Sequence, residues 1–574
     1  LDPTPEFLAI KEQVISNSEL FAPESWPMLI EPNDWSDNYA GGYLLNEVMR
    51  GHKMIRQVDS HLVQGERAFD FLNKVQKVPY TLNTFITDVA ETLYERGHTV
   101  GKFIPRWHEE PPPKPPNMED DEIKQAYKRA KAEWHNRQND NAQRCVRTKR
   151  TMDAVRRHLK YPKFFLPWSY DYRGRAYPIP TVLTHQDTDF GKSLLKFYEP
   201  AQVTDQSKYW LAFQVATTYG LDKSTMTERL EWVKDNESLI EHVATDPVGN
   251  ISLWEKVDEP WSFLAACEEY YHCVIKGDRK TTNLAVAVDA TCSGVQILAG
   301  LARDASAARL VNVLPSDKPQ DAYQVVADAL KPELPDHLQQ YMNRKIVKRC
   351  VMTIPYNAKS LSNRDYIREA LKDEFDYEIS KDDLSLIVSK LRGNKEHEIT
   401  GVMQQILPGP MAVMSWIEKE IARQIRNGKT EITWTSPSGF KVYQKFMKKE
   451  VEQVELKLMG RVRMNVSVGD TKEVDLLHHK NATSPNLIHS VDGALLHLAT
   501  LDFDHPISLI HDSVLCRATD MDQLSHLVRE KYMEIFANNN YLQQWADEIG
   551  AIEPPPMVNT LRPELVIEST YFFC

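Results

Sequence analysis

The run from Leu284 to Gly294 constrains this chain more than any other stretch, because it leads a short apolar segment into a single carboxylate. Its residues are Leu-Ala-Val-Ala-Val-Asp-Ala-Thr-Cys-Ser-Gly, and a second apolar stretch from Val295 to Leu301 follows. A short apolar run bounded by turn-forming residues indicates a buried strand. Asp289 then lies at the end of that strand, where a rigid backbone can present its side chain to a cleft. A lone aspartate before a helix is more often a cap than a catalyst, so catalysis requires a partner elsewhere in the chain.

Composition narrows the classes of protein without choosing among them. The chain has 574 residues, enough for several domains or for one large body with subdomains. No run of about 18 apolar residues occurs, so we expect no membrane span. The net charge of −12 argues against a protein that coats nucleic acid nonspecifically, although it leaves room for a local basic cleft. The seven cysteines form no CxxC pair, which fits a reducing compartment better than a disulfide framework or a cysteine zinc site.

A second carboxylate stands in a matching setting. Asp512 interrupts the apolar stretch from Ile507 to Cys516, which predicts a tight hairpin with the acid at its tip. Its neighbours His511 and Ser513 suggest a hydrolase triad, but consecutive residues on one strand point to opposite faces and cannot form one. If the two acid-bearing strands are neighbours in one sheet, their carboxylates converge.

Converging carboxylates repel one another unless cations separate them. Mg²⁺ prefers oxygen ligands and keeps positions open for phosphate oxygens. Two such ions, about 3.5–4 Å apart, stabilise both the attacking and the leaving oxygen in phosphoryl transfer. The two acids therefore predict a nucleotidyl-transfer site, provided that the chain also supplies cations for a triphosphate.

A helical segment supplies those cations. Arg344 and Lys348 lie about 40° apart around a helix, and Tyr356 can stay on the same side. Pro355 should end or bend the helix, since it lacks an N–H and clashes with the preceding turn. Two cations and a phenol facing one cleft suit a triphosphate and a sugar; an amphipathic helix with a basic face is the alternative.

Two further segments are rich in basic residues. Arg173 and Arg175, separated by one glycine among aromatic residues, can present two forks to a phosphate or sugar backbone, or can pair with Asp171 and neighbouring acids. Between residues 144 and 163 the alternatives are a solvated helix face and an arm that tracks phosphates. The basic residues there are Arg144, Arg147, Lys149, Arg150, Arg156, Arg157, Lys160 and Lys163.

Periodicity outlines the other elements. Residues 66–101 show a helical pattern, and residues 430–475 alternate in polarity, which predicts a long β-ribbon. Such a ribbon fits a DNA major groove, although a structural hairpin is the default interpretation. Pro485 begins a segment that predicts the start of a helix, and His489 within it is, by itself, more often a satisfied polar residue than a catalyst.

Five short motifs, in a fixed order along nearly the whole chain, resemble those of one family. Each is weak alone, but five in this order are specific. The chain resembles the single-subunit DNA-directed RNA polymerases of bacteriophages and mitochondria, and most closely the phage enzymes. The motifs are Asp171-Tyr-Arg173-Gly-Arg175, Val288-Asp289-Ala-Thr-Cys-Ser-Gly-Val-Gln296, Arg344-x-x-x-Lys348-Arg-x-Val-Met-Thr-x-x-Tyr356, Pro485-Asn-x-x-His489-Ser-x-Asp492-Gly493 and His511-Asp512-Ser513.

The resemblance implies a mixed α/β fold, largely helical, in the right-hand arrangement of palm, thumb and fingers. The implied palm is split, and the fingers lie between its two parts. The implied divisions are 1–65 as a remnant of an N-terminal domain and linker, 66–161 as the thumb, 162–317 as the palm with a helical insertion at about 200–280, 318–489 as the fingers with a promoter-reading hairpin at about 443–475, and 490–574 as the second part of the palm with a C-terminal foot.

The resemblance also implies a metal site and a catalytic set. Asp289, Asp512 and the backbone carbonyl of Ala290 would bind two Mg²⁺ ions. The catalytic set would be the two aspartates with Lys348, which would also protonate the leaving pyrophosphate, and Tyr356.

Further residues would bind the substrates. Tyr356 and His489 would select ribose over deoxyribose, because a 2′-OH can both donate and accept a hydrogen bond. The other implied contacts are Arg344, Lys348 and Lys223 with the incoming triphosphate, Arg173 and Arg175 with the template–transcript hybrid, and Arg461 and Arg463 with promoter DNA. The aromatic segment Tyr571 to Cys574 would pack near the active site.

This sequence departs from the family pattern at a few positions. Ala290 stands where the phage enzymes have glycine, and Ile297 replaces a histidine. Asn357 follows Tyr356 where glycine is usual, with Pro355 before it. The family's N-terminal promoter domain is largely absent from this chain, which means either that it was removed or that this protein lacks it. The chain begins with leucine, so we expect its natural start to lie outside this sequence.

We therefore expect a DNA-directed RNA polymerase that transfers nucleotides from NTPs to RNA and releases pyrophosphate. The expected partners are template and promoter DNA, the RNA transcript and NTPs, with a monomeric protein and no membrane. The expected location is the cytoplasm of an infected bacterium, with the mitochondrial matrix as the alternative. The alternative functions are a related DNA polymerase, which usually carries Glu after the second Asp, and a nucleic-acid-binding scaffold with an inactive site.

Overall fold

A six-stranded sheet forms the base of the molecule. The structure is a computed structural model that describes residue 4, residue 10 and residues 25–44, 51–57, 61–394, 399–456, 462–537 and 540–574. The strand order is β11-β12-β6-β5-β1-β2, and every neighbouring pair is antiparallel. The strands are β1 (Pro79–Leu82), β2 (Phe164–Phe165), β5 (Leu195–Gln202), β6 (Thr281–Asp289), β11 (Ile507–Ile510) and β12 (Ser513–Arg517).

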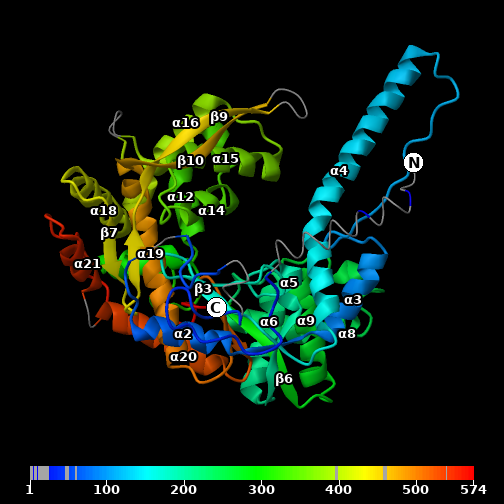
Figure 1. The fold of residues 1–574 in the computed structure, drawn as a ribbon, viewed down its shortest axis with the longest axis horizontal. Coiled ribbons are helices and arrows are strands. Elements are labelled where there is room, and N and C mark those ends of the chain that lie inside the picture. The colour runs from blue at the N-terminus through cyan, green and yellow to red at the C-terminus, as the bar shows by residue number, and fades with distance from the viewer. Residues whose placement is uncertain are drawn as a thin grey trace.

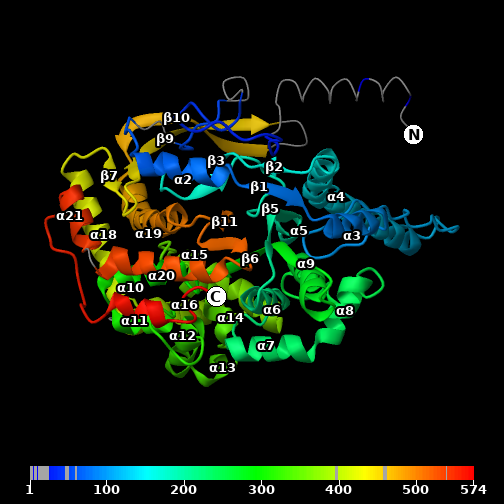
Figure 2. The same ribbon diagram turned by 90° about the horizontal axis from the view of Figure 1, so that it is seen from below.

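The strand β6 is the one that the opening motif predicts. Its residues alternate in burial, with Leu284, Val286 and Val288 buried on one face, as expected for a strand whose successive side chains point to opposite faces. Helices α6 and α9 pack against β6. Figure 2 shows α6 to α9 gathered beside β5 and β6. These helices are α5 (Asp189–Ser193), α6 (Asp205–Tyr219), α7 (Met226–Asp235), α8 (Glu237–Thr245) and α9 (Pro260–Tyr270).

A single long helix, α4 (Asp121–His158), projects from one side of the sheet (Figure 1). The side chain of its N-cap, Asp120, accepts hydrogen bonds from the amides of Glu122 and Ile123. Before α4, the predicted helical stretch 66–101 is in fact two helices, α2 (Glu66–Gln76) and α3 (Thr84–Glu95), with β1 between them. The prediction was wrong there because Tyr80 and Leu82 bury themselves in the central sheet, a tertiary contact that local periodicity does not report.

The opposite side of the molecule is built from helices and two β-ribbons. The ribbon β9–β10 lies across the top of this part in Figure 1, and its register shifts beside Gly469. The predicted ribbon over 430–475 is therefore two successive ribbons, β7–β8 and β9–β10. The elements are α10 (Ser293–Ala302), α11 (Ala305–Leu310), α12 (Ala322–Leu330), α13 (Asp336–Gln339), α14 (Arg344–Met352), α15 (Ser360–Phe375), α16 (Lys381–Arg392), α17 (Val402–Ile406), α18 (Pro408–Arg426), β7 (Ile432–Thr435), β8 (Lys441–Gln444), β9 (Met447–Leu456) and β10 (Val462–Val474).

The helix α19 (Leu476–Leu501) runs through the interior and packs on α10, α18 and α20. The predicted start at Pro485 was wrong, because Asp475 caps the helix ten residues earlier and Pro485 lies inside it. A proline there removes one helical hydrogen bond, which other contacts must replace. The remaining elements are β3 (Trp168–Tyr170), β4 (Ala176–Pro178), α20 (Met521–Ala537) and α21 (Tyr541–Ile549).

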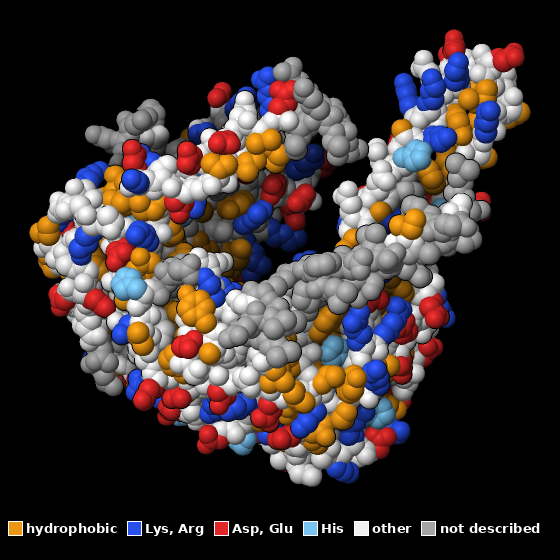
Figure 3. All heavy atoms as spheres, viewed as in Figure 1, with side chains coloured by type: hydrophobic (Ala, Val, Ile, Leu, Met, Phe, Trp, Pro, Cys, Tyr) orange, Lys and Arg blue, Asp and Glu red, His pale blue; other side chains and the backbone are white. Residues whose placement is uncertain are grey.

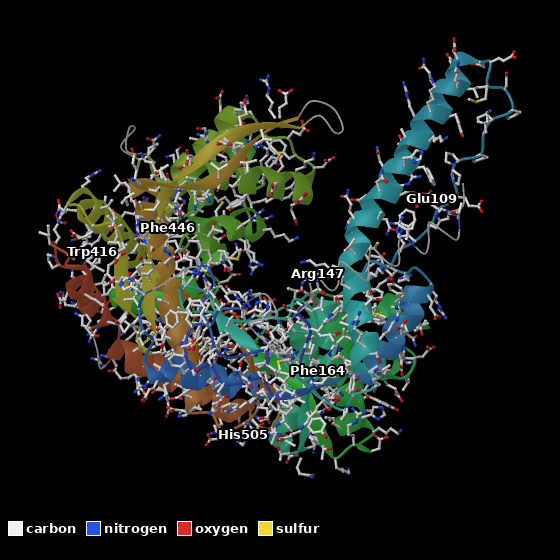
Figure 4. The ribbon with its side chains drawn as sticks, in the orientation of Figure 1. Glu109, Arg147, Phe164, Trp416, Phe446 and His505 are labelled. Carbon is white, nitrogen blue, oxygen red and sulfur yellow. The ribbon has the colours of Figure 1, made fainter. Side chains whose placement is uncertain are left out.

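These parts form a right hand around a hollow. We call the six-stranded sheet the palm, α4 the thumb, and α12 to α18 with β9–β10 the fingers. Figure 3 shows the surface hollowed between thumb and fingers, with Lys and Arg side chains gathered in the hollow. In Figure 4, Arg147 on the thumb and Phe446 at the base of the β9–β10 ribbon lie on opposite sides of this opening. The expected class, mixed α/β and largely helical, is confirmed.

Within the described ranges, no helix combines the length and apolarity that crossing a bilayer requires.

A buried histidine lies where α19 meets α2 and β3. His497 packs its ring on Phe71, with 4.2 Å between ring centroids, and on Tyr170. Its Nδ1 is 3.1 Å from the hydroxyl of Ser438. Burial lowers the pKa of His497 to about 3, so the imidazole is neutral in the folded protein.

We predict that His497 makes the fold sensitive to acid. Because its folded pKa lies below the unfolded value of about 6.5, its contribution to stability is complete above pH 6.5 and declines by about 1.4 kcal/mol per pH unit as the pH falls from there toward 3. His497→Phe should therefore show a shallower fall in melting temperature between pH 7 and pH 4.5 than the unchanged chain. Ser438 keeps Ser436 as a hydrogen-bond partner in that variant. Parallel slopes in the two proteins would contradict the prediction.

Candidate active site

The two predicted carboxylates meet at one edge of the palm. Strands β6 and β12 pair directly, with Ser513 opposite Asp289. Asp512 lies in the two-residue turn between β11 and β12, immediately before Ser513. The first turn residue, His511, has a left-handed backbone with φ of +56°. The predicted hairpin with an acid at its tip is thus present, and it places Asp512 beside the end of β6.

The two carboxylates act on one another electrostatically. The side chain of Asp289 is open to the hollow, yet protein surrounds it closely enough that burial, together with the neighbouring Asp512, raises its pKa to about 7. The hydroxyl of Ser513 donates to Asp289 Oδ1 at 3.0 Å, which partly offsets that effect. The donor set is hard oxygen, and it leaves room for water and phosphate oxygens, so it fits Mg²⁺. Within the described part of the chain, no group of three or more His, Cys, Asp or Glu side chains forms a separate metal site.

The cationic helix of the fingers is α14, which Asn343 caps through hydrogen bonds from the amides of Lys345 and Ile346. Arg344 forms an ion pair with Asp321 and lies over the ring of Tyr323, 5.4 Å from its centroid. The ion pair orients Arg344, and Asp321 and Tyr323 are contacts that no sequence motif indicated.

Lys348, one turn further along α14, is exposed. It forms no hydrogen bond or ion pair with any residue that the structure describes, so its charge remains available. The helix ends at Met352, before Pro355, as predicted.

The rings of Tyr356 and His489 pack on one another at a tilt of 31°, with 4.8 Å between ring centroids. Arg173 Nη1 lies 2.8 Å from His489 Nδ1. Burial, reinforced by Arg175 and Arg173, lowers the pKa of His489 well below its usual value, so the ring is neutral. Because a guanidinium can only donate, Nδ1 accepts, and the proton of the neutral ring lies on Nε2. His489 is therefore a hydrogen-bond donor at Nε2, next to a phenol that can donate or accept.

The two arginines of the Arg173-Gly-Arg175 turn both have carboxylate partners. Arg173 pairs with Asp171 at 2.7 Å. Arg175 is buried and forms a two-pronged ion pair with Asp492, through Nε at 3.0 Å and through Nη2. For Arg173 this is the pairing alternative that the sequence left open, whereas Asp492 as the partner of Arg175 was not predicted. A contact of either arginine with a template–transcript hybrid stays a prediction.

Other predicted residues lie around this centre. Lys223 is exposed in the turn between α6 and α7, 3.0 Å from Asp222. Its charge also acts on the thiol of Cys292, whose pKa burial raises, which places the lysine toward the loop after Asp289. Arg463 is exposed on β10, with Glu455 at 3.5 Å. Arg461 lies outside the described residues.

The segment 571–574 packs against the loop that follows Asp289, as predicted. The amide of Cys574 donates to the Asp289 carbonyl at 3.1 Å, and Ala290 forms a bridge with Phe573. Thr291 Oγ1 donates to the carbonyl of Tyr571 at 2.8 Å. These contacts fix the backbone beside the carboxylate pair.

Fold and site together define the class of right-hand nucleic-acid polymerases. A family model described as DNA-dependent RNA polymerase matches residues 201–558, and the chain belongs to this family.

The chain is similar to named members of the family. It is 25% identical to the DNA-directed RNA polymerase of Enterobacteria phage K11, over 92% of this chain and 65% of that protein. It is 27% identical to DNA-directed RNA polymerase 3, chloroplastic, of Nicotiana sylvestris, over 95% of this chain and 58% of that protein. It is 24% identical to the DNA-directed RNA polymerase of Enterobacteria phage T3, over 96% of this chain and 70% of that protein. The chain thus spans somewhat more than half of the length of these relatives.

The glycine of the Asp492-Gly493 motif has a steric role that can be tested. A Cβ at Gly493 would lie 2.9 Å from the carbonyl oxygen of Gly174, so only glycine lets α19 approach the turn that carries Arg175. Gly493→Ala should lower the stability by about 1–3 kcal/mol, a typical cost of overpacking, and lower the melting temperature accordingly. Gly469→Ala is the matched control, because nothing lies within 4 Å of its added Cβ. Equal melting temperatures of the two variants would contradict this account.

Proposed function

We propose that this chain synthesises RNA on a DNA template, from nucleoside triphosphates and with release of pyrophosphate. The observation that carries the proposal is that the pairing of β6 with β12 sets Asp289 beside Asp512, whose charge also acts on Tyr356 in the turn that follows the cationic helix α14. Membership of the polymerase family supports it. A DNA template with its promoter, RNA and NTPs are the partners that this activity requires.

Asp289, Asp512 and the carbonyl of Ala290 would hold two Mg²⁺ ions. When bound, these ions would offset the negative charge on the attacking and leaving oxygens and align them for in-line transfer. The residues of the chain prepare the site for this. Ser513 holds one oxygen of Asp289, and the contact of its carbonyl with the Cys574 amide fixes the backbone.

The fingers would bind the triphosphate and deliver a proton. Arg344 is held by Asp321 and presents a fixed guanidinium to phosphate oxygens. Lys348, which has no partner among the described residues, attracts the remaining phosphate charge and gives a proton to the pyrophosphate as it leaves. Lys223 adds a third cation at the other side of the hollow. General acid catalysis of this kind contributes about 10²–10⁴-fold to a rate.

Sugar selection would fall to Tyr356 and His489. His489 offers Nε2–H as a donor, and the Tyr356 ring, which carries a hydroxyl, packs against the His489 ring. A ribose 2′-OH can satisfy both groups, whereas a deoxyribose leaves them without a partner in a half-buried place.

Promoter recognition would fall to the ribbon β9–β10, with Arg461 and Arg463 as the proposed contacts. A two-stranded ribbon of this kind fits the DNA major groove. The proposed location is the cytoplasm of an infected bacterium, which fits the similarity to phage enzymes.

The first prediction of this proposal concerns the carboxylates. Asp289→Asn and Asp512→Asn should each reduce nucleotide addition by at least about 10²-fold, because each removes charge from the site that neutralises the reacting phosphate. Extension of an RNA primer annealed to a DNA template measures this without promoter recognition, and fluorescence anisotropy should show unchanged DNA binding.

The matched control is Asp504→Asn, on an almost fully exposed side chain in the segment just before β11. It should retain full activity. If Asp289→Asn and Asp512→Asn extend the primer at the rate of the unchanged chain, the roles proposed for the two carboxylates fail. If the unchanged chain extends no primer, the scaffold interpretation is favoured and the proposed activity fails.

The second prediction concerns the sugar. Tyr356→Phe should lower the preference for rNTPs over dNTPs, measured as a ratio of kcat/KM, by about tenfold, because one hydrogen bond to the 2′-OH is lost. Addition of ribonucleotides should continue at nearly the original kcat. Tyr366→Phe serves as the control, because the Tyr366 ring of α15 lies under Arg349 of α14. A preference of the unchanged chain for dNTPs would favour the DNA polymerase alternative.

A further inference from the structure

The turn that carries Tyr356 ends on an unusual backbone. Asn357 has φ of +58°, in the left-handed region. The turn is closed by hydrogen bonds from the amides of Tyr356 and Ala358 to the carbonyl of Thr353, each at 3.2 Å. Among residues other than glycine, asparagine is one of the few that adopts this conformation readily. Asn357 therefore adopts the left-handed backbone conformation that suits the glycine of the family pattern, and it adds a side chain.

That side chain completes a helix that a proline interrupts. Pro485 has no N–H, so the carbonyl of Asn481, four residues earlier in α19, loses its helical donor. Asn357 Nδ2 donates to this carbonyl at 3.1 Å. Because Asn357 is 9% exposed, the contact satisfies polar groups that little water can reach.

The same amide belongs to a charged cluster that joins three elements. Asn357 Nδ2 also donates to Glu418 Oε1 of α18 at 2.7 Å. Lys359 Nζ donates to Asn357 Oδ1 at 2.7 Å and to Glu418 at 2.9 Å, and Lys480 of α19 lies 3.5 Å from Glu418. Burial alone would raise the pKa of Glu418, but the hydrogen bonds from Lys359 and Asn357 outweigh it and lower the pKa. The carboxylate is therefore charged, and the cluster ties the Tyr356 turn to both helices.

The position of Tyr356 follows from what holds its two neighbours. Its ring packs on His489, eight residues after Asn481 on the same helix. On the other side, Pro355 packs so closely on Gly294 that a Cβ added to Gly294 would lie 2.5 Å from it. Gly294 follows Asp289 by five residues. The residue before Tyr356 is thus fixed to the start of α10, which follows Asp289, and the residue after it is fixed to the helix of His489.

We propose that Asn357 is a positioning residue for sugar selection. Its amide replaces the helical donor that Pro485 lacks, and by this contact it holds the Tyr356 hydroxyl at a set place beside His489. The inference rests on the proposed polymerase function. It concerns the amide side chain of Asn357, which is absent where the family pattern has glycine.

The test compares Asn357→Gly with the unchanged chain in primer extension with rNTPs and dNTPs. Glycine keeps the left-handed backbone and removes only the amide. The expected result is an approximately fivefold loss in the preference for rNTPs, the effect of about one hydrogen bond, with a higher KM for rNTPs and a nearly unchanged kcat. Asn559→Gly is the matched control, since Asn559 is exposed and has nearly the same backbone, with φ of +58°. It should leave the preference unchanged.

A second substitution tests the proposed contact itself. Pro485→Ala restores the N–H that the Asn481 carbonyl lacks, so the amide of Asn357 is no longer needed as its donor. In a Pro485→Ala background, Asn357→Gly should therefore cost less preference for rNTPs than it does in the unchanged chain, and the two substitutions should be non-additive.

The outcomes separate this inference from the function on which it rests. If the unchanged chain does not extend an RNA primer, the proposed function fails. If the chain is active and Asn357→Gly keeps the full preference for rNTPs, the inference fails. The inference also fails if Asn357→Gly lowers kcat equally for both kinds of nucleotide, or if its effect is the same with and without Pro485, since either result means a general structural role.

Discussion

The antiparallel pairing of β6 with β12 is the contact on which the rest of the site depends. It joins two strands that are distant in sequence and sets Asp512 beside Asp289. The two charges repel, and burial together with this repulsion raises the pKa of Asp289. The apolar faces of both strands, with Val286, Val288 and Val514 buried, supply the free energy that holds the acids together. Two carboxylates held close together in this way favour the binding of a cation between them.

Sequence motifs identified the elements whose signal is local. The apolar run into Asp289 predicted β6, the interrupted apolar run predicted the hairpin at Asp512, and Pro355 predicted the end of α14. Each of these depends on residues adjacent in the chain. The carboxylate pair itself became predictable only because both motifs place an aspartate at the end of an apolar segment.

Contacts between distant segments could not be predicted in this way. Residues 79–82 form a strand because an open edge of β5 is there to pair with, although the surrounding periodicity is helical. The helix α19 continues through Pro485 because the side chain of Asn357, over a hundred residues away, supplies a donor to the Asn481 carbonyl. The pairing of Arg173 with Asp171 could be named as one of two alternatives, and the fold decides between them. The pairing of Arg175 with Asp492, a residue distant in sequence, was not predicted.

The distribution of paired cations explains how an acidic chain can present a basic hollow. On the thumb, Arg147 pairs with Asp187 and Arg156 with Glu91, so the excess of basic residues there is partly neutralised and serves to anchor α4. Arg175 is likewise neutralised by Asp492. A paired cation attracts phosphate only weakly, because its partner cancels its field beyond a few ångströms. Lys348 has no such partner within the described residues, so its field extends into the hollow. Net charge therefore predicts little about phosphate binding here; what matters is which cations the fold leaves without carboxylates, and where they face.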